Sequence, residues 1–292
     1  DCDERFGDNT PASWSVRGIS SAVPAFDGSY LYVAEFEELR IPSRDEGIDL
    51  RAWKLPATAG ADAPRIIVLH GFGTCVRDPA VLAPAGMLHH LGYEVLMLDL
   101  RDHGASSVED GRTAGGAEEY RDVMGAVDHL VADGAQPGRI GVLGTSMGAA
   151  TAIIAASHDE RIAAVWADSA YTDIESRIAE GLEDSGLPGA LAPLALLTAR
   201  LVSGDDLASA SAVGQLDGMR GRHLYVVHGL LDGLIDVSHA ERLTQAAVAA
   251  GVLTERWVVS DAGHVDVALV HPDEYERRLG EFFGTALGVT EA

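Results

Sequence analysis

The segment 139–148 contains a serine, Ser146, whose surroundings would allow it to act as a nucleophile. Ser146 is flanked by Gly144 and Gly148, and it lies between an apolar segment and a run of small residues. A serine on a sharp turn from a strand into a helix is held in strained geometry with its hydroxyl exposed. The amino end of the helix, with the N–H of Met147, can stabilise developing negative charge. The pattern predicts acyl transfer by Ser146, whereas the competing interpretation is an ordinary tight turn that contains a serine.

A second glycine-rich turn, at residues 70–73 with the sequence His-Gly-Phe-Gly, follows an apolar segment. Flanking glycines let the N–H of Phe72 point inward, so we expect this amide to be the second donor of an oxyanion hole. The alternative is a turn with no catalytic part. Phosphate binding is excluded for the serine turn because neither Gly-x-Gly-x-x-Gly nor a Lys-Ser/Thr pair accompanies it.

The acid and the base are expected later in the chain. Asp232 and His264 each stand in a loop after an apolar segment. Serine, then acid, then histidine is one order in which α/β sheets carry a catalytic triad. We therefore expect His264 to take the proton of Ser146 as general base. Asp232 would fix the tautomer of His264 and stabilise its imidazolium form.

Other side chains compete for these two roles. Asp236 could reach the same space as Asp232, and Asp168 follows an earlier apolar segment. His264 is preferred because it alone among the histidines after the acid occupies a loop that follows a strand and has a glycine beside it. The polar segment 99–106 is expected to form a buried turn that shapes the site. Five further histidines are expected to make ordinary hydrogen bonds: His70, His103, His228, His239 and His271.

Composition limits the partners. Of the 292 residues, 47% are hydrophobic and 23% are charged, close to the averages for soluble globular proteins. The formal net charge is −24, from 21 basic and 45 acidic side chains, and such a surface repels phosphate backbones and anionic lipid headgroups. The longest apolar runs are far shorter than the ~20 residues that a membrane helix needs. We expect no nucleic acid partner and no stable membrane insertion, and the oligomeric state stays open.

The two cysteines, Cys2 and Cys75, allow at most one disulfide, and of the two possibilities we favour free thiols. Two isolated cysteines cannot make a thiolate zinc site, and no His-Glu-x-x-His motif is present, so no metal or cofactor is expected. The chain begins with Asp1 rather than methionine, so we expect that an upstream segment was removed. Export or envelope association in a bacterium and a cytoplasmic location both stay open.

Hydrophobic periodicity predicts the elements that must position these residues. Residues 1–29 are expected to form an irregular arm, and residues 30–292 one domain that begins with a hairpin of strands at 30–41 and 48–55. Alternation of strands and helices then predicts a mostly parallel sheet covered on both faces. Fully buried strands are expected at 66–69, 95–98, 140–143, 162–166, 224–227 and 256–259, and helices at 80–91, 117–132, 147–157, 238–251 and 273–287.

One long segment interrupts the alternation, at residues 171–222. It is too long for a simple crossover, and its two apolar helical stretches, at 174–182 and 190–202, predict a small helical cap over one edge of the sheet. The apolar part, residues 187–202, is expected to pack over the active site. A dimer surface and a lipid-facing lid are the alternatives.

Together these motifs resemble the α/β-hydrolase superfamily over about residues 35–287. Within it the chain is similar to bacterial esterase-like hydrolases related to the BEM46 proteins and to prolyl-oligopeptidase-like catalytic domains, whose members often carry an amino-terminal export or anchor segment. The resemblance implies a triad of Ser146, Asp232 and His264, with the Phe72 and Met147 amides as oxyanion hole. One departure is an extra acidic residue in the segment 45–47, for which we expect no catalytic consequence. The segments that carry the resemblance are 70–73, 99–104, 144–148, 263–264, 41–45 and 168–170.

The expected reaction is hydrolysis of a small carboxylic ester through an acyl-serine intermediate. Peptidase, thioesterase and perhydrolase activities would use the same residues and stay open, because the cap rather than the triad selects the substrate. A non-catalytic binding module of the same fold should lack a triad residue, whereas each position is filled here. A dehalogenase or epoxide hydrolase with an aspartate nucleophile is disfavoured because the turn holds Ser146.

Overall fold

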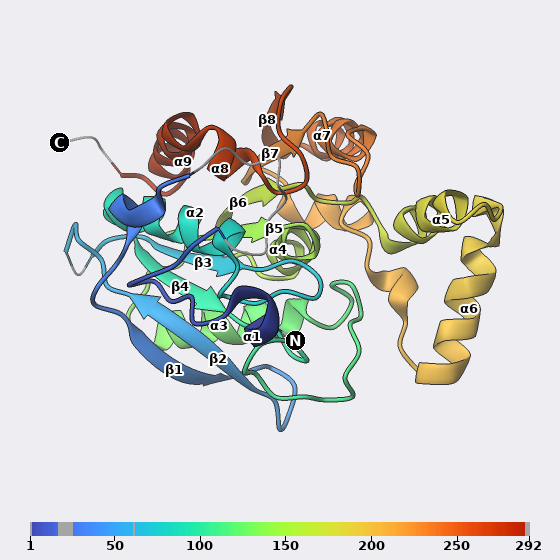
Figure 1. Ribbon diagram of the computed structural model, residues 1–292, viewed down its shortest axis with the longest axis horizontal. Coiled ribbons are helices and arrows are strands. Elements are labelled where there is room, and N and C mark those ends of the chain that lie inside the picture. Colours follow the sequence, from blue (N-terminus) through green and yellow to red (C-terminus); the bar gives the residue numbers. More distant parts are fainter. Residues whose placement is uncertain (1, 17–25, 61, 290–292) are drawn as a thin grey trace.

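The computed structural model describes residues 2–16, 26–60 and 62–289, and eight strands of these residues form one central sheet (Figure 1). The order across the sheet is β1-β2-β4-β3-β5-β6-β7-β8. In this order β2 runs antiparallel to both of its neighbours, β1 and β4, and the six strands from β4 to β8 are parallel to one another. The predicted mostly parallel α/β sheet is confirmed. The strands are β1 (Glu37–Pro42), β2 (Asp49–Leu55), β3 (Arg65–Leu69), β4 (Glu94–Leu98), β5 (Ile140–Thr145), β6 (Ile162–Asp168), β7 (His223–Gly229) and β8 (Leu253–Val259).

Two strand predictions need correction. The first strand begins at Glu37 rather than at residue 30, because Gly28–Leu31 forms a 3-10 turn, η1, whose Ser29 N–H is capped by the Asp27 carboxylate at 3.0 Å. The last strand, β8, is not fully buried. It pairs only with β7 at the edge of the sheet, so most of its side chains remain at least partly exposed.

Helices cover both faces of the sheet, as the alternation predicts. Side chains alternate along each strand, so Ile66 and Val68 of β3 pack in one apolar cluster with α2, α8 and α9, while Ile67 and Leu69 pack in a second cluster with α3, α4 and α7. These helices are α2 (Pro79–His90), α3 (Tyr120–Ala132), α4 (Met147–His158), α7 (Ser238–Ala250), α8 (Val267–Val270) and α9 (Pro272–Ala286).

In the segment between β6 and β7, the helices α5 and α6 project from the sheet at one end of the molecule (Figure 1), whereas residues 213–219 pack on α4 and α7. The apolar residues 187–202 do not pack over the cavity that contains Ser146, contrary to our expectation, because none of them lines it. Many instead face solvent, including Leu194, Leu197 and Leu201. The segment contains α5 (Ile174–Asp184), η2 (Gly189–Leu191), α6 (Ala192–Ser203), η3 (Leu207–Ser209) and η4 (Val213–Met219).

The amino-terminal segment is tied to the domain more firmly than expected. It contains a short helix, α1 (Cys2–Phe6), and the side chains of Phe6 and Trp14 are buried. Cys2 and Cys75 form a disulfide with a Cα–Cα distance of 6.2 Å, so the prediction of free thiols is wrong. The rest of the predicted arm, residues 17–25, lies outside the described residues. None of the helices that the structure describes is long and apolar enough to cross a membrane.

Candidate active site

Ser146 stands at the turn between β5 and α4. Its φ angle is +53°, a conformation that side-chain-bearing residues rarely adopt, and its N–H donates to the carbonyl of Asp168 at 2.8 Å. Glycines are needed on either side, since a Cβ at Gly144 would overlap the carbonyl of Gly148, and a Cβ at Gly148 would overlap the carbonyl of His70. Close packing of strand against helix thus forces the serine onto a strained turn.

The structure brings the three predicted side chains together. His264 Nε2 lies 3.0 Å from Ser146 Oγ, and His264 Nδ1 lies 2.7 Å from Asp232 Oδ2. The second carboxylate oxygen of Asp232 accepts N–H groups of its own loop, from Leu234 at 2.9 Å and Ile235 at 2.8 Å. With Nδ1–H donated to Asp232, the histidine presents the lone pair of Nε2 to the serine hydroxyl.

Asp232 is held as an anion. Burial alone would raise its pKa, but hydrogen bonds from His228 and His264 and from the Ile235 N–H outweigh this effect and hold the pKa well below its usual range. Its side chain is fully buried, whereas that of His264 retains a fifth of its exposure. A buried carboxylate beside the imidazole can stabilise the imidazolium that forms when Ser146 gives up its proton.

The rival acids have other partners. Asp236 accepts the Ser238 N–H at 2.9 Å and so caps the start of α7. Asp168 accepts the hydroxyls of Tyr275 and Ser169, both at 3.0 Å. Burial raises the pKa of Asp168 to about 6 despite these two donors. Within the described part of the chain, neither carboxylate hydrogen-bonds His264.

His228, for which the sequence predicted only ordinary hydrogen bonds, lies beside Asp232 in the site. Its buried Nε2 lies 2.9 Å from the carbonyl of Ile235 and 3.3 Å from Asp232 Oδ2. Hydrogen bonds to Asp232 and to that carbonyl raise the pKa of His228 even though burial opposes this. The signal in the sequence was its place at the end of a strand, four residues before the acid.

Several residues at or beside the three predicted triad residues have strained backbone conformations. Besides Ser146, the residues Ser169 and Val265 have positive φ angles of +56° and +53°. Val265 directly follows the histidine, and its N–H donates to Ser169 Oγ at 3.2 Å. A β-branched residue in this conformation is costly and persists only where surrounding bonds hold it, which is typical of functional loops.

The two amides expected to form an oxyanion hole belong to Phe72 and Met147. A Cβ built on Gly71 would lie 3.2 Å from the Cβ of Ser146, so the loop after β3 packs directly against this serine. Among the described residues, the N–H groups of Phe72 and Met147 donate to no other group. Met147 also begins α4, whose positive dipole end faces the serine.

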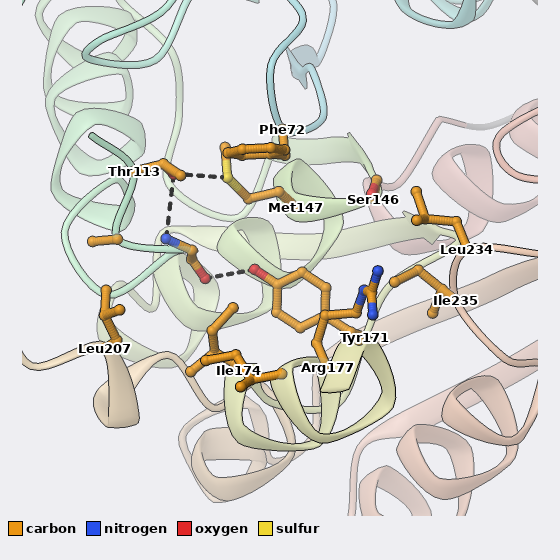
Figure 2. Close-up of a pocket in the computed structure, with 14 residues that line it drawn as sticks. Phe72, Thr113, Ser146, Met147, Tyr171, Ile174, Arg177, Leu207, Leu234 and Ile235 are labelled. Atoms are coloured by element: carbon orange, nitrogen blue, oxygen red, sulfur yellow. Dashed lines mark hydrogen bonds between the residues drawn. The ribbon is translucent and has the colours of Figure 1, made fainter. Parts of the chain in front are cut away.

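A mostly apolar cavity of about 440 Å³ adjoins Ser146 (Figure 2). Its wall opposite the nucleophile is the loop 113–116, which the buried Glu119 organises by accepting the N–H groups of Ala114 and Gly116, each at 2.8 Å. Tyr171 donates to the Gly115 carbonyl of the same loop at 2.6 Å. The helix predicted from residue 117 therefore begins only at Tyr120. This wall could not be predicted from the sequence, because its residues carry no recognisable motif.

Across residues 2–16, 26–60 and 62–289, no group of three or more His, Cys, Asp or Glu side chains is placed to hold a metal ion.

Comparisons with known proteins agree with this architecture. The family described as alpha/beta hydrolase fold matches residues 64–217. The solved structure of a Pyrococcus furiosus esterase superposes with a TM-score of 0.71 at 26% identity, covering 91% of this chain and 98% of that one. A puromycin-hydrolyzing peptidase of Mycobacterium tuberculosis gives 0.72 at 18% identity, covering 94% of this chain and 42% of that one, and shows the fold alone.

Among curated proteins, the bovine protein phosphatase methylesterase 1 is 27% identical over 126 residues, covering 43% of this chain and 31% of that protein. The rat protein of the same name is 25% identical over 149 residues, 51% of this chain and 33% of that one. The chain thus spans about a third of the length of these curated relatives. Since the family match covers more than half of the 292 residues, and the sheet and the serine turn have the expected form, the chain belongs to the α/β-hydrolase family.

Proposed function

We propose that this protein is a carboxylesterase that hydrolyses small esters through an acyl-serine intermediate. The observation that carries the proposal is the continuous hydrogen-bonded chain from Ser146 Oγ through His264 to the buried Asp232, at 3.0 and 2.7 Å, beside an apolar cavity. An esterase is among the similar solved structures and a methylesterase among the curated relatives, which supports ester chemistry. The finer likeness to prolyl-oligopeptidase-like and BEM46-related hydrolases is part of the same proposal.

In the acylation half of the reaction, Ser146 Oγ attacks the ester carbonyl carbon while His264 Nε2 takes the hydroxyl proton. The carbonyl oxygen becomes an oxyanion that the Phe72 and Met147 amides stabilise. Collapse of the tetrahedral intermediate breaks the bond to the alkoxy group. His264 returns the proton to that group, and the alcohol leaves.

In the deacylation half, a water molecule gives its proton to His264 Nε2 and attacks the acyl-serine carbonyl. The same two amides stabilise the second oxyanion, and collapse releases the carboxylic acid and restores the proton to Ser146. Asp232 holds the imidazole through both halves without itself becoming protonated.

The test is replacement of the nucleophile. Ser146→Ala should abolish turnover of p-nitrophenyl acetate and butyrate, and covalent labelling by a fluorophosphonate probe should disappear with it. Circular dichroism would establish that the variant is folded. Turnover or labelling that survives in the folded variant would overturn the proposal.

A panel of esters, thioesters and short peptides of graded length separates the chemistries that share this triad. We expect esters of small acids to have the highest kcat/KM, since the cavity of about 440 Å³ has an apolar lining that offers few groups to bind a peptide backbone. A peptide or thioester with the higher kcat/KM would reassign the enzyme within the family.

A further inference from the structure

Arg177 is the one charged side chain among the described residues that line the cavity beside Ser146. It comes from α5, and in Figure 2 its guanidinium lies between the ring of Tyr171 and the side chains of Leu234 and Ile235. The rest of the lining is almost entirely apolar. A cation in such surroundings interacts with an opposite charge more strongly than a cation on an open surface does.

Within the described residues, Arg177 makes neither a side-chain hydrogen bond nor an ion pair. Carboxylates are plentiful in this chain, which has 45 acidic side chains against 21 basic ones. Two buried arginines use them: Arg51 pairs with Asp99 at 2.6 Å and Arg101 with Asp122 at 2.7 Å.

The two carboxylates that could reach Arg177 along its own helix already have partners. Asp173, one turn earlier, caps α5 by accepting the N–H and the hydroxyl of Ser176 at 2.7 and 3.0 Å. Glu180, one turn later, lies 2.6 Å from Nε2 of the buried His239. Both neighbours are therefore engaged, and the cation stays directed at the cavity.

From this arrangement we propose that the enzyme prefers esters that carry a carboxylate remote from the scissile bond, and that Arg177 binds this carboxylate. The inference rests on the proposed ester hydrolysis and adds the class of substrate. A guanidinium presents two parallel N–H donors that match the two oxygens of a carboxylate. The apolar lining between Ser146 and Arg177 would hold the intervening methylene groups.

The charge of the whole protein makes a local cation necessary for such a substrate. The formal net charge of −24 opposes the approach of an anion, although salt at physiological strength screens this repulsion beyond about 8 Å. At shorter range only a group within the cavity can offset it. Arg177 is the lining residue with the required charge.

The test compares each anionic ester with a neutral ester of matched length. Monomethyl esters of glutarate, adipate and pimelate place the carboxylate on the acyl side, and acetate esters of 4-hydroxybutanoate and 6-hydroxyhexanoate place it on the alcohol side. Methyl esters of fatty acids and alkyl acetates are the neutral partners. Initial rates are followed by titration of released acid at constant pH, and the preference is the ratio of the two kcat/KM values.

Arg177→Gln should lower the preference for the anionic ester by about 10-fold or more, chiefly through a higher KM, since it removes a charge-assisted pair. Arg177→Lys should restore part of the preference, because it keeps the charge without the paired donors. Raised salt should weaken the wild-type preference. The matched control is Arg200→Gln on α6, which removes an arginine that pairs with Asp206 at 3.5 Å and does not line the cavity.

Binding without turnover separates this inference from the proposed function. In the Ser146→Ala background, calorimetric titration with adipate should show binding that Arg177→Gln weakens and Arg200→Gln does not. If Ser146→Ala keeps full ester turnover, the proposed function fails, whatever adipate does. If Ser146→Ala is inactive but Arg177→Gln changes neither the preference nor adipate binding, only the carboxylate site is overturned.

Discussion

The imidazole of His228 lies against the carboxylate of Asp232, with its Nε2 3.3 Å from Oδ2, the same oxygen that His264 Nδ1 approaches at 2.7 Å. One carboxylate oxygen of Asp232 thus has two histidine neighbours, and one of them, His264, also faces Ser146. In this position His228 can orient the carboxylate of Asp232 and so influence His264 without contacting a substrate itself.

Replacement of His228 should therefore change catalysis as well as stability. His228→Phe keeps the size of the ring but removes the donor to Asp232, and we expect kcat/KM to fall about 10-fold or more. The acidic limb of the pH–rate profile should move to higher pH, because an acid with one donor fewer stabilises the His264 imidazolium more strongly.

The conservative variant His228→Gln supplies the control, since its amide can reach a similar position. It should recover part of the lost rate and of the original pH profile. If the pH–rate profile of His228→Phe is unchanged and its activity falls only as much as its amount of folded protein, His228 is purely structural.

The assignment of the acid is tested by a pair of isosteric substitutions. Asp232→Asn should lower kcat by roughly 10³ to 10⁴, because the imidazole loses both its fixed tautomer and its counter-charge. Asp236→Asn keeps an oxygen that can accept the Ser238 N–H, so it should change kcat less than about twofold and leave the free energy of unfolding nearly unchanged. Equal losses of kcat in the two variants would contradict the assignment.

Much of this site could be predicted from the sequence because its signals are local. Ser146 carries its own motif, with glycines whose Cβ atoms would collide with neighbouring backbone. Asp232 and His264 follow buried strands in the required order, and parallel strands bring their carboxyl ends to one edge of the sheet. Local pattern together with topology was sufficient to predict that these three side chains lie together, while their catalytic roles remain part of our proposal.

Other features depend on contacts between distant segments, which periodicity does not record. The buried Glu119 organises the cavity wall through bonds to loop amides, so the residues before Tyr120 are drawn out of the predicted helix. Exposure of the apolar side chains of α6 could not be foreseen either, since a helical pattern shows an apolar face without showing what covers it.

The Cys2–Cys75 disulfide was missed for the same reason and leads to a stability prediction. It closes a loop with a sequence separation of 73, for which the chain-entropy argument gives about 4 kcal/mol of stabilisation. We expect Cys2→Ser to lower the free energy of unfolding in urea by up to this amount. Cys75 is fully buried and a poor site for a hydroxyl, so Cys2 is the better position to change.

Wild-type protein with a reductant is the matched control for Cys2→Ser, and the two should unfold at the same urea concentration. Reductant should leave the Cys2→Ser protein unaffected. A wild-type protein whose midpoint does not move on complete reduction would show that the crosslink contributes no stability.

The buried His70 predicts a loss of stability in acid. Its Nε2 accepts the Leu100 N–H at 3.1 Å, and its Nδ1 lies 2.8 Å from the Gly71 carbonyl. A second proton, on Nε2, would therefore face the Leu100 N–H, with two donors and no acceptor between them. Burial, with His103 nearby, lowers the pKa of His70 to about 4. The unfolded chain therefore binds this proton at higher pH than the folded chain does. Titration of His70 therefore costs no stability above about pH 6.5. As the pH falls towards 4, it lowers the free energy of unfolding by about 3 kcal/mol.

Two buried acids oppose this trend, because burial raises the pKa of Asp78 and of Asp168 to about 6 and so favours the folded state as the pH falls. The contribution of His70 must therefore be measured as a difference. His70→Gln keeps a neutral donor and acceptor but cannot take up the proton. The free energy of unfolding of the wild type minus that of His70→Gln should decrease by about 3 kcal/mol between pH 7 and pH 4. A difference that stays constant over this range would show that His70 does not resist protonation in the folded protein.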